Sequence, residues 1–523
     1  MGITNYKVYT PYEYGKLIVK LALKNYFKND YSLEKLNNLR AVDLSCGTGN
    51  LIVILLEKLL LISKKITGEY FFNSEWIRGY DIDEKAFCEC VKNSREILKK
   101  YNLSGEIEGF IQNSLTDDSH KRKYNIVIGN PPYIGEKNHQ YLFAGIKNTE
   151  FGKKYYEAKM DYFYFFIEKG IDILENEGIL VYVTTNYWLK ADGAAILRKK
   201  LRGEGHFTHI VDYNISIFKD APGQHNMIFS WRKNQEISEK EKIENENFIA
   251  DTEKEENKFS VKNKNLYDEK GNIILIDDKS RIFNKKVKEK SNCKLDDIVN
   301  INQGIVSGCD KAFITKIYNE KFGEYLKPFY KNKVIFKYSC KKENDFWIYY
   351  IPRGREISEE LKEIFFPYKD ILEKRREVVK GTHKWYELSW GRDENIMSGE
   401  KILARQRCKT NYFAYHKGDF FGSADIYYLT LKNSSFNIFY ILGYLNSEIF
   451  YQWYKNNGKS KGYNLEFYTT PLKEVPVYYP EDKKEAEYIE ILVKKQIEKY
   501  SDDIQNEINK YFINKFEINL DNK

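Results

Sequence analysis

The tetrapeptide Asn130-Pro131-Pro132-Tyr133 holds the residues of this chain that are best suited to chemistry. It directly follows the apolar run 124–129, which predicts a buried strand, and open α/β sheets bind ligands at the carboxyl ends of such strands. Asn130 offers an amide oxygen, and two consecutive prolines form a stiff turn that presents carbonyls without N–H donors. Tyr133 adds a flat aromatic face. Two acceptors beside an aromatic ring can hold a planar amine, such as the amino group of a nucleobase, for attack on an electrophile.

A glycine-rich turn earlier in the chain predicts a binding place for a cofactor. The apolar strand expected over 41–44 runs into a turn that contains Gly47 and Gly49, and an apolar helix is expected over 51–61. Glycine lets the backbone turn tightly and approach a ligand closely. The turn lacks the Gly-Lys-Ser/Thr of a phosphate loop and the full dinucleotide fingerprint, so by itself it does not identify the ligand.

Two acidic residues lie at the end of the next expected strand, 77–81. An acid at this place in a βαβ unit can bind ribose hydroxyls, and Asp81 suits that role. Asp83 is better suited to cap the helix that starts near Glu84. The glycine turn, the ribose acid and the tetrapeptide at Asn130 therefore follow one another in a consistent order.

With these motifs, the chain resembles the AdoMet-dependent DNA methyltransferases of the adenine-N6 type, in particular the gamma class of TaqI-type enzymes and, within it, the orphan adenine methyltransferases of clostridia. The resemblance extends over nearly the whole chain and is carried by residues 45–47, 80–86, 129–135, 303–313 and 384–392. It implies S-adenosyl-L-methionine as cofactor, S-adenosyl-L-homocysteine as product, and methyl transfer to the amino group of an adenine flipped out of duplex DNA. It also implies a doubly wound, seven-stranded sheet with its last strand antiparallel, followed by a C-terminal α+β target-recognition domain.

The same resemblance implies roles for individual residues. Asn130 and the carbonyl of Pro131 would accept the two hydrogen bonds of the adenine amine, and Phe218 would face Tyr133 across the base. Asn113 stands where many relatives have an acid, and its amide oxygen can still accept a hydrogen bond from the cofactor's adenine. The other residues assigned to the cofactor are Tyr9, Thr10 and Pro11, which would close over its methionine part, Asp43, Ser45 and Gly47 beneath it, Asp81 at the ribose, Ile82 and Phe166 at the adenine ring, and Asn130 itself.

The pattern of strands and helices predicts where the domains lie. We expect a catalytic domain over 1–235, a charged linker or excursion over 236–290 with one short strand at 273–276, the target-recognition domain over 291–480 and a helical tail over 481–523. The strands of the catalytic domain are expected at 41–44, 77–81, 106–112, 125–129, 178–185, 209–213 and 227–231.

Basic charge is concentrated in the region expected to recognise the target. The whole chain has a net charge of +8, and residues 291–480 hold 30 lysines and arginines against 23 acidic residues, so the rest of the chain is nearly neutral. A polyanion such as double-stranded DNA would bind there and lose affinity as salt rises. Candidate contacts are Arg405, Arg407, Lys459 and Lys461, with plain phosphate anchoring as the alternative to base reading for each of them.

Composition places the chain among globular proteins of the cytoplasm. It has 523 residues, 42% of them hydrophobic and 31% charged. No apolar run approaches the ~18 residues of a membrane-spanning helix, and the N-terminus does not look like a signal peptide. Seven scattered cysteines indicate a reducing compartment. Cys88 and Cys90 have no partners at zinc spacing, so we read them as packing residues and expect no metal. One chain with both catalysis and recognition is expected to act as a monomer on DNA.

Several other functions stay open. The Asn-Pro-Pro-Tyr motif also occurs in protein-glutamine methyltransferases and, in variant form, in RNA guanine-N2 methyltransferases, although those chains usually lack a basic domain of this size. The chain could serve as the modification subunit of a restriction–modification system. A fusion to a nuclease is not expected, because the AdoMet segment begins at Tyr9 and no nuclease core stands out downstream. A DNA-binding module without catalysis is also not expected, because Asn130 and the glycine turn are intact.

Overall fold

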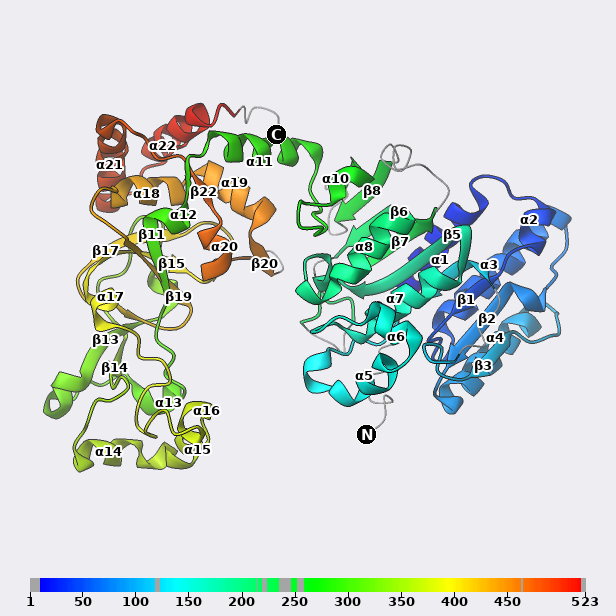
Figure 1. Ribbon diagram of the computed structural model, residues 1–523, viewed down its shortest axis with the longest axis horizontal. Helices are drawn as coiled ribbons and strands as arrows, with labels where there is room; N and C mark the ends of the chain where they lie inside the picture. Colours follow the sequence, from blue (N-terminus) through cyan, green and yellow to red (C-terminus); the bar gives the residue numbers. More distant parts are fainter. Residues whose placement is uncertain are drawn as a thin grey trace. The chain divides into compact units, whose positions relative to one another are not determined.

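The chain folds into two compact units, which divide between Asp277 and Asp278. We call them the first unit and the second unit; each is described by itself (Figure 1). The computed structural model describes residues 10–117, 123–213, 215–218, 223–234, 246–251, 258–461 and 464–518.

The first unit is built on one sheet that contains all seven expected strands. They stand in the order β3-β2-β1-β4-β5-β7-β6, and only β7 runs antiparallel to its neighbours among these seven. The order reverses between β1 and β4, so the carboxyl ends of these two strands form the switch point where such sheets bind ligands. The predicted doubly wound, seven-stranded arrangement is confirmed. The strands are β1 (Ala41–Asp43), β2 (Ile77–Asp81), β3 (Glu108–Ile111), β4 (Tyr124–Gly129), β5 (Leu174–Thr185), β6 (Gly205–Asp212) and β7 (Asn226–Lys233).

Helices cover both faces of this sheet because its central strands are apolar on both sides. In β4, Ile126 and Ile128 pack with α1, α3 and α4, whereas Val127 between them packs with α7 and α8. Figure 1 shows these two helix layers on either side of the strands. Within α4, Cys90 is buried as expected, but Cys88 is exposed, which corrects its interpretation as a packing residue. The helices are α1 (Tyr12–Phe27), α2 (Leu33–Asn37), α3 (Asn50–Thr67), α4 (Glu84–Lys100), α5 (Gln140–Lys147), α6 (Glu150–Tyr155), α7 (Tyr162–Ile173) and α8 (Ala195–Glu204).

The segment expected to be a charged excursion contributes to the sheet. Strands β8 (Glu246–Asp251) and β9 (Lys258–Lys262) extend it beyond β6, and α10 (Asn263–Leu266) follows. In β9 the apolar residues alternate with lysine and serine, and Val261 is buried against the core of the first unit. The expected strand at 273–276 is wrong: Ile273 forms only an isolated bridge with Tyr267. The sequence analysis expected a charged excursion here because lysine and glutamate dominate the segment. A strand with one buried face needs an apolar residue only at every second position, so the exposed charged positions between them do not exclude a strand.

The second unit is an α+β domain made of several small sheets. Its two four-stranded sheets have the orders β11-β19-β15-β17 and β12-β14-β13-β18, and two smaller sheets have the orders β16-β21-β20 and β10-β22. The strands are β10 (Cys293–Lys294), β11 (Val299–Gln303), β12 (Ile314–Thr315), β13 (Leu326–Tyr330), β14 (Phe346–Tyr349), β15 (Glu400–Arg405), β16 (Arg407–Cys408), β17 (Phe413–Lys417), β18 (Phe421–Gly422), β19 (Ile426–Leu431), β20 (Lys459–Lys461), β21 (Asn464–Glu466) and β22 (Pro476–Val477).

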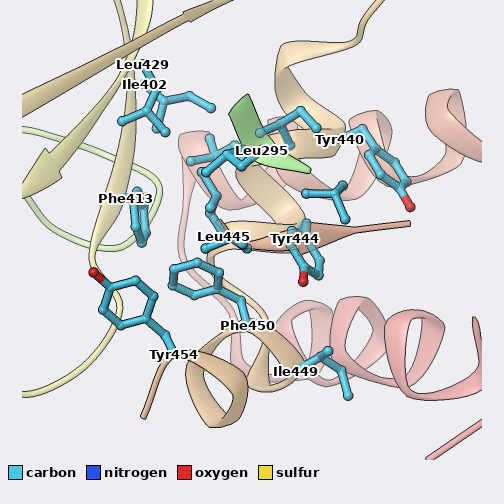
Figure 2. Close-up of a cluster of buried hydrophobic side chains, with 14 of the residues drawn as sticks. Leu295, Ile402, Phe413, Leu429, Tyr440, Tyr444, Leu445, Ile449, Phe450 and Tyr454 are labelled. Atoms are coloured by element: carbon cyan, nitrogen blue, oxygen red, sulfur yellow. The ribbon is translucent and has the colours of Figure 1, made fainter. Parts of the chain in front are cut away.

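The helices of the second unit pack into a core that includes the C-terminal tail. Figure 2 shows Tyr444 and Leu445 of α18 beside Phe450 of α19 and Phe413 of β17. Gly443 lets α18 approach α21 closely, since a Cβ there would lie 2.9 Å from Ile489. The helices are α11 (Asp278–Lys290), α12 (Leu295–Ile298), α13 (Asp310–Phe313), α14 (Glu359–Phe365), α15 (Lys369–Glu373), α16 (Arg376–Val379), α17 (Glu394–Ser398), α18 (Ile438–Leu445), α19 (Glu448–Asn457), α20 (Thr469–Lys473), α21 (Lys483–Glu498) and α22 (Asp502–Lys515). No helix in the described residues of either unit has the length and apolar character needed to cross a bilayer.

Candidate active site

The turn after β1 is held by the acid that ends β2. The backbone N–H of Gly47 donates to Oδ2 of Asp81 over 2.7 Å, and the N–H of Ser45 donates to Oδ1 of Asp43 over 2.9 Å. Gly47 has a φ of +54°, and a Cβ built on it would meet no atom of the described residues within 4 Å. The backbone at Gly47 therefore has open space beside it, so a ligand could approach it closely.

Gly49, two residues further on, packs against α4 and leaves no space for a ligand beside it. Its φ is +87°, and a Cβ at this position would lie 2.5 Å from Sγ of Cys90 in α4. It is also the residue that caps α3. Of the two glycines in the turn, Gly47 therefore leaves room above the sheet, and Gly49 lets α3 begin in close contact with α4.

Burial perturbs the acid at the end of β1. The pKa of Asp43 is raised to about 7. Desolvation is the largest cause and the charge of Asp81 adds to it, whereas the hydrogen bond from the N–H of Ser45 acts in the opposite direction. A positively charged ligand beside Asp43 would favour its ionised form. Asp83, as expected, caps α4, and its side chain accepts from the N–H of Ala86 over 3.0 Å.

Asn130 and Tyr133 lie at the end of β4 and contact each other. The hydroxyl of Tyr133 lies 2.8 Å from Oδ1 of Asn130 and 3.0 Å from the carbonyl oxygen of Val183 in β5. A phenol has one proton and can donate to only one of these acceptors at a time. Burial holds the pKa of Tyr133 well above its usual value, so the phenol stays protonated. The next residue, Ile134, donates its N–H over 2.8 Å to Asp161, the cap of α7.

The structure brings Tyr133 and Phe218, the two rings that the resemblance assigns to the flipped base, close to each other. Their ring centroids are 6.3 Å apart and the rings are tilted by 54°. A flat base between two parallel rings needs roughly 3.5–4 Å of contact on each side, which is more than this spacing provides, so one of the rings has to move before a base can enter. Phe163 of α7 meets Tyr133 edge to face at 5.5 Å. Phe163 was not among the predicted site residues, although it lies in the aromatic run that follows the cap of α7.

The other residues predicted to bind the cofactor occupy different environments. Thr10 is buried beside the glycine turn, and its carbonyl accepts from Nδ2 of Asn50 over 3.4 Å. Ile82, directly after Asp81, is 46% exposed and could be covered by a planar ring. Oδ1 of Asn113 accepts from the N–H of Leu115 over 3.1 Å. The remaining ones are Pro11, which is exposed at the start of α1, Phe166, which is buried in the α7 core, and Tyr9, which lies outside the described residues.

The predicted DNA contacts of the second unit are engaged in contacts within the protein. Arg405 donates to the carbonyls of Ile335, over 2.7 Å, and Lys333, over 3.0 Å. Arg407 donates to the buried carboxylate of Glu466 over 2.5 Å. The Glu466 carboxylate also lies 3.7 Å from the amine of Lys459, and the side chain of Lys461 lies outside the described residues. Two of the three described cations therefore hold neighbouring strands and loops together.

The fold and the geometry of the first unit define a class of protein. A seven-stranded sheet of this order, with a glycine turn after β1, an acid after β2 and an amide after β4, is the AdoMet-dependent methyltransferase fold. The solved structure of the Type IIL restriction-modification enzyme MmeI in complex with DNA matches with a TM-score of 0.67 at 14% identity, covering 98% of this chain and 74% of that one. At this identity the match shows the fold alone.

Sequence comparison then supports a more specific family. The Eco57I restriction-modification methylase model matches residues 37–218, and the TaqI-like C-terminal specificity domain model matches residues 327–477. The Type II methyltransferase M.HindII of Haemophilus influenzae is 28% identical over 475 residues, which cover 81% of this chain and 87% of that protein. The release factor glutamine methyltransferase of Clostridium botulinum is 25% identical over 120 residues, or 22% of this chain and 41% of that protein. Together these matches support a restriction-modification methylase of the gamma class with DNA methyltransferase activity, and they imply AdoMet as its cofactor.

Proposed function

We propose that this chain is a site-specific DNA adenine-N6 methyltransferase, which transfers a methyl group from AdoMet to an adenine flipped out of duplex DNA. The observation that carries the proposal is the grouping at the end of β4. There the amide oxygen of Asn130 lies beside the paired rings of Tyr133 and Phe218. An acceptor next to flat apolar rings suits the amino group of a base better than it suits a flexible side chain.

The site would take up the base in two movements. Flipping costs a few kcal/mol, and stacking on aromatic rings returns roughly 1–3 kcal/mol per base. The ring of Phe218 moves away from Tyr133 to admit the adenine, and the hydroxyl of Tyr133 turns toward the carbonyl of Val183. Oδ1 of Asn130 and the carbonyl of Pro131 then accept the two N6–H bonds. These bonds draw the nitrogen toward tetrahedral geometry and make its lone pair available for an in-line attack on the methyl carbon of the donor. The N–C bond would form as the C–S bond breaks, S-adenosyl-L-homocysteine would leave, and one N6 proton would be lost to solvent.

The residues at β1 and β2 fit the cofactor. AdoMet, when bound, supplies an electrophilic methyl group on a positively charged sulfur. The open backbone at Gly47 would lie beneath it, and the carboxylate of Asp81 would bind the ribose hydroxyls. Ile82 would pack on the adenine ring and bury its exposed surface. Asp43 would become ionised beside the cationic donor, and Asn113 would border the adenine amine. Catalysis is then mainly a matter of positioning and charge stabilisation.

The proposal extends to partners and biological setting. Double-stranded DNA would bind one chain acting as a monomer in the cytoplasm, at the nucleoid, without a metal ion. The resemblance to orphan methyltransferases supports an enzyme without a nuclease partner, whereas the restriction-modification relatives support the modification enzyme of a two-component system. Protein-glutamine methylation is the main competing function, since the Asn-Pro-Pro-Tyr motif also occurs in protein-glutamine methyltransferases and 120 residues of this chain match a release factor glutamine methyltransferase.

Methylation assays on three substrates test the proposal directly. Purified protein with radioactive AdoMet should label duplex DNA and leave RNA and release factor unlabelled. Modification-sensitive sequencing of DNA from a host that expresses the chain should then show N6-methyladenine at one recurring sequence. Label on release factor or RNA alone would replace the proposal with one of those alternatives, and no label on duplex DNA would refute it.

A further inference from the structure

A basic segment of the second unit lies outside the DNA contacts that the sequence predicts. Residues 374–384 contain five lysines and arginines and one glutamate. Lys374, Arg376 and Lys380 are exposed, and none of the three has an ion-pair partner among the described residues. We call residues 374–392 the 374–392 surface; in Figure 1 it includes α16, next to α15. Its exposed cations are available to a polyanion.

The backbone of this surface is fixed by a half-buried arginine, Arg375. The guanidinium of Arg375 donates to the carbonyls of Trp385, over 2.7 Å, and Glu387, over 2.8 Å. It also packs on Gly308, where a Cβ would lie 2.7 Å from Nη1 of Arg375. Glu387 is buried in turn, and its carboxylate accepts from the N–H groups of Gly354 and Lys384 over 2.7 and 2.9 Å. The loop between the exposed cations and Trp390 is therefore held by several hydrogen bonds.

An exposed tryptophan stands on this fixed backbone. Trp390 is 51% exposed, although its N–H and C=O groups both pair with Val306, at 3.0 and 3.1 Å. The ring of His383 lies 6.3 Å from its indole, and the guanidinium of Arg392 lies 5.9 Å from the ring centre. Arg392 has a φ of +68°, and its Nε donates to the carbonyl of Gly304 over 3.1 Å. A large aromatic side chain held out on rigid backbone is typical of a binding contact.

We propose that the 374–392 surface contacts duplex DNA; this rests on the proposed function. Lys374, Arg376 and Lys380 neutralise backbone phosphates, and the indole of Trp390 packs against a sugar or base edge. Charge complementarity selects DNA as the occupant, since the cations lack acidic partners and surround an aromatic ring. By contrast, Arg405 and Arg407 are held within the protein. The 374–392 surface, more than those arginines, supplies the electrostatic contact.

The salt dependence of DNA binding tests the cations. Affinity for a fluorescein-labelled mixed-sequence duplex is measured by anisotropy over a range of salt concentrations. The variant Lys374→Ala/Arg376→Ala/Lys380→Ala should lower the slope of log affinity against log salt by about three, because each lost phosphate contact removes about one. The matched control is Lys484→Ala/Lys495→Ala/Lys510→Ala, which removes the same charge from exposed positions of α21 and α22 and should leave the slope unchanged. A wild-type slope in the first variant, or equal loss in both, would overturn the proposal.

A second variant tests the tryptophan. Trp390→Ala should weaken binding by roughly fivefold or more at every salt concentration, without changing the slope, and Trp390→Phe should restore part of the affinity. Unchanged affinity in Trp390→Ala would remove the ring from the interface. If the triple variant does not fold, the single change Lys380→Gln should still lower the slope by about one. These outcomes are separable from the proposed function: wild-type protein that methylates DNA while the variants bind it normally refutes this surface alone.

Discussion

The two units use polar side chains in opposite ways. In the first unit, Asp43, Asp81 and Asn130 stand at the ends of neighbouring parallel strands and point their acceptors at one edge of the sheet. In the second unit, Arg375 and Arg405 donate to backbone carbonyls of segments that lie up to 72 residues away in the sequence. One unit gathers polar groups at one edge of its sheet, where we propose that ligands bind, and the other uses them to hold irregular segments in place.

This difference follows from architecture. The loops at the end of a parallel sheet are short and adjacent in space, so each motif can supply one group to a common site. Small sheets joined by long loops bury many carbonyls outside regular structure, and buried carbonyls need donors. In the second unit, cations that lack such partners are therefore the better candidates for contact with a partner molecule. The predictions below test how far the two units differ, from the largest expected effect to the smallest.

The largest expected effect is a loss of stability in the second unit when one residue of its helical core is truncated. Phe512 is fully buried in α22, with its ring 5.5 Å from that of Tyr440 and 5.3 Å from that of Tyr444. Phe512→Ala should lower the free energy of unfolding by about 3–5 kcal/mol, because it leaves a cavity in the helical core. Calorimetry should show one transition moved and the transition of the first unit unchanged. The exposed change Lys510→Ala is the control, and an equal shift of both transitions would show that the units do not unfold separately.

The next effect concerns catalysis by the first unit. Asn130→Ala removes the acceptor proposed for the adenine amine and should reduce kcat for methyl transfer by about 10²–10³-fold, as loss of one group that stabilises a transition state does. Rapid-quench assays with duplex DNA measure it. Asn125→Ala is the matched control on the same strand: its side chain bonds the backbone of Arg40 and Asn38, so the variant should lose stability but retain kcat. Full activity in Asn130→Ala would remove this residue from the mechanism.

The first unit could be predicted from the sequence because its signals are local. The strand expected at 77–81 has the observed bounds of β2, and every other strand of the seven lies within a few residues of its expected place. Asp83 was correctly assigned as a helix cap. Buried strands are continuous apolar runs, and the turns that carry the proposed site residues directly follow three of them, β1, β2 and β4. Strands β8 and β9 were missed because charge dominates their exposed surroundings.

The second unit was predictable only in outline. Several of its strands, such as β12 and β18, are two residues long and exist because of partners far along the chain. The role of Arg405 depends on the carbonyls of Lys333 and Ile335, which no local pattern connects to it. The sequence predicts which residues are basic, but pairing over long distances decides which of them are satisfied within the protein.

A smaller effect is expected for two neighbouring acids, Asp81 and Asp83, to which we assign different roles. Asp81→Ala should weaken AdoMet binding roughly ten- to a hundredfold, because hydrogen bonds to a charged group are worth about 1.5–3 kcal/mol. Asp83→Ala removes the cap of α4 and should lower stability by about 0.5–2 kcal/mol while AdoMet affinity stays the same. Titration calorimetry and thermal melts on both variants separate the two roles. Equal affinities in the two variants would contradict the assignment of Asp81 to the ribose.

The smallest effect concerns the hydroxyl of Tyr133. Tyr133→Phe keeps the ring that would stack on the base and removes the group that lies 2.8 Å from Oδ1 of Asn130. A neutral hydrogen bond contributes about 0.5–1.5 kcal/mol, so kcat should fall no more than roughly tenfold and DNA affinity should not change. Tyr133→Ala, which also removes the ring, should lower kcat further and weaken retention of a flipped base, measured by the fluorescence of 2-aminopurine at the target position. If Tyr133→Phe were as inactive as Tyr133→Ala, the hydroxyl that orients Asn130, rather than the stacking ring, would be the main contribution of this residue.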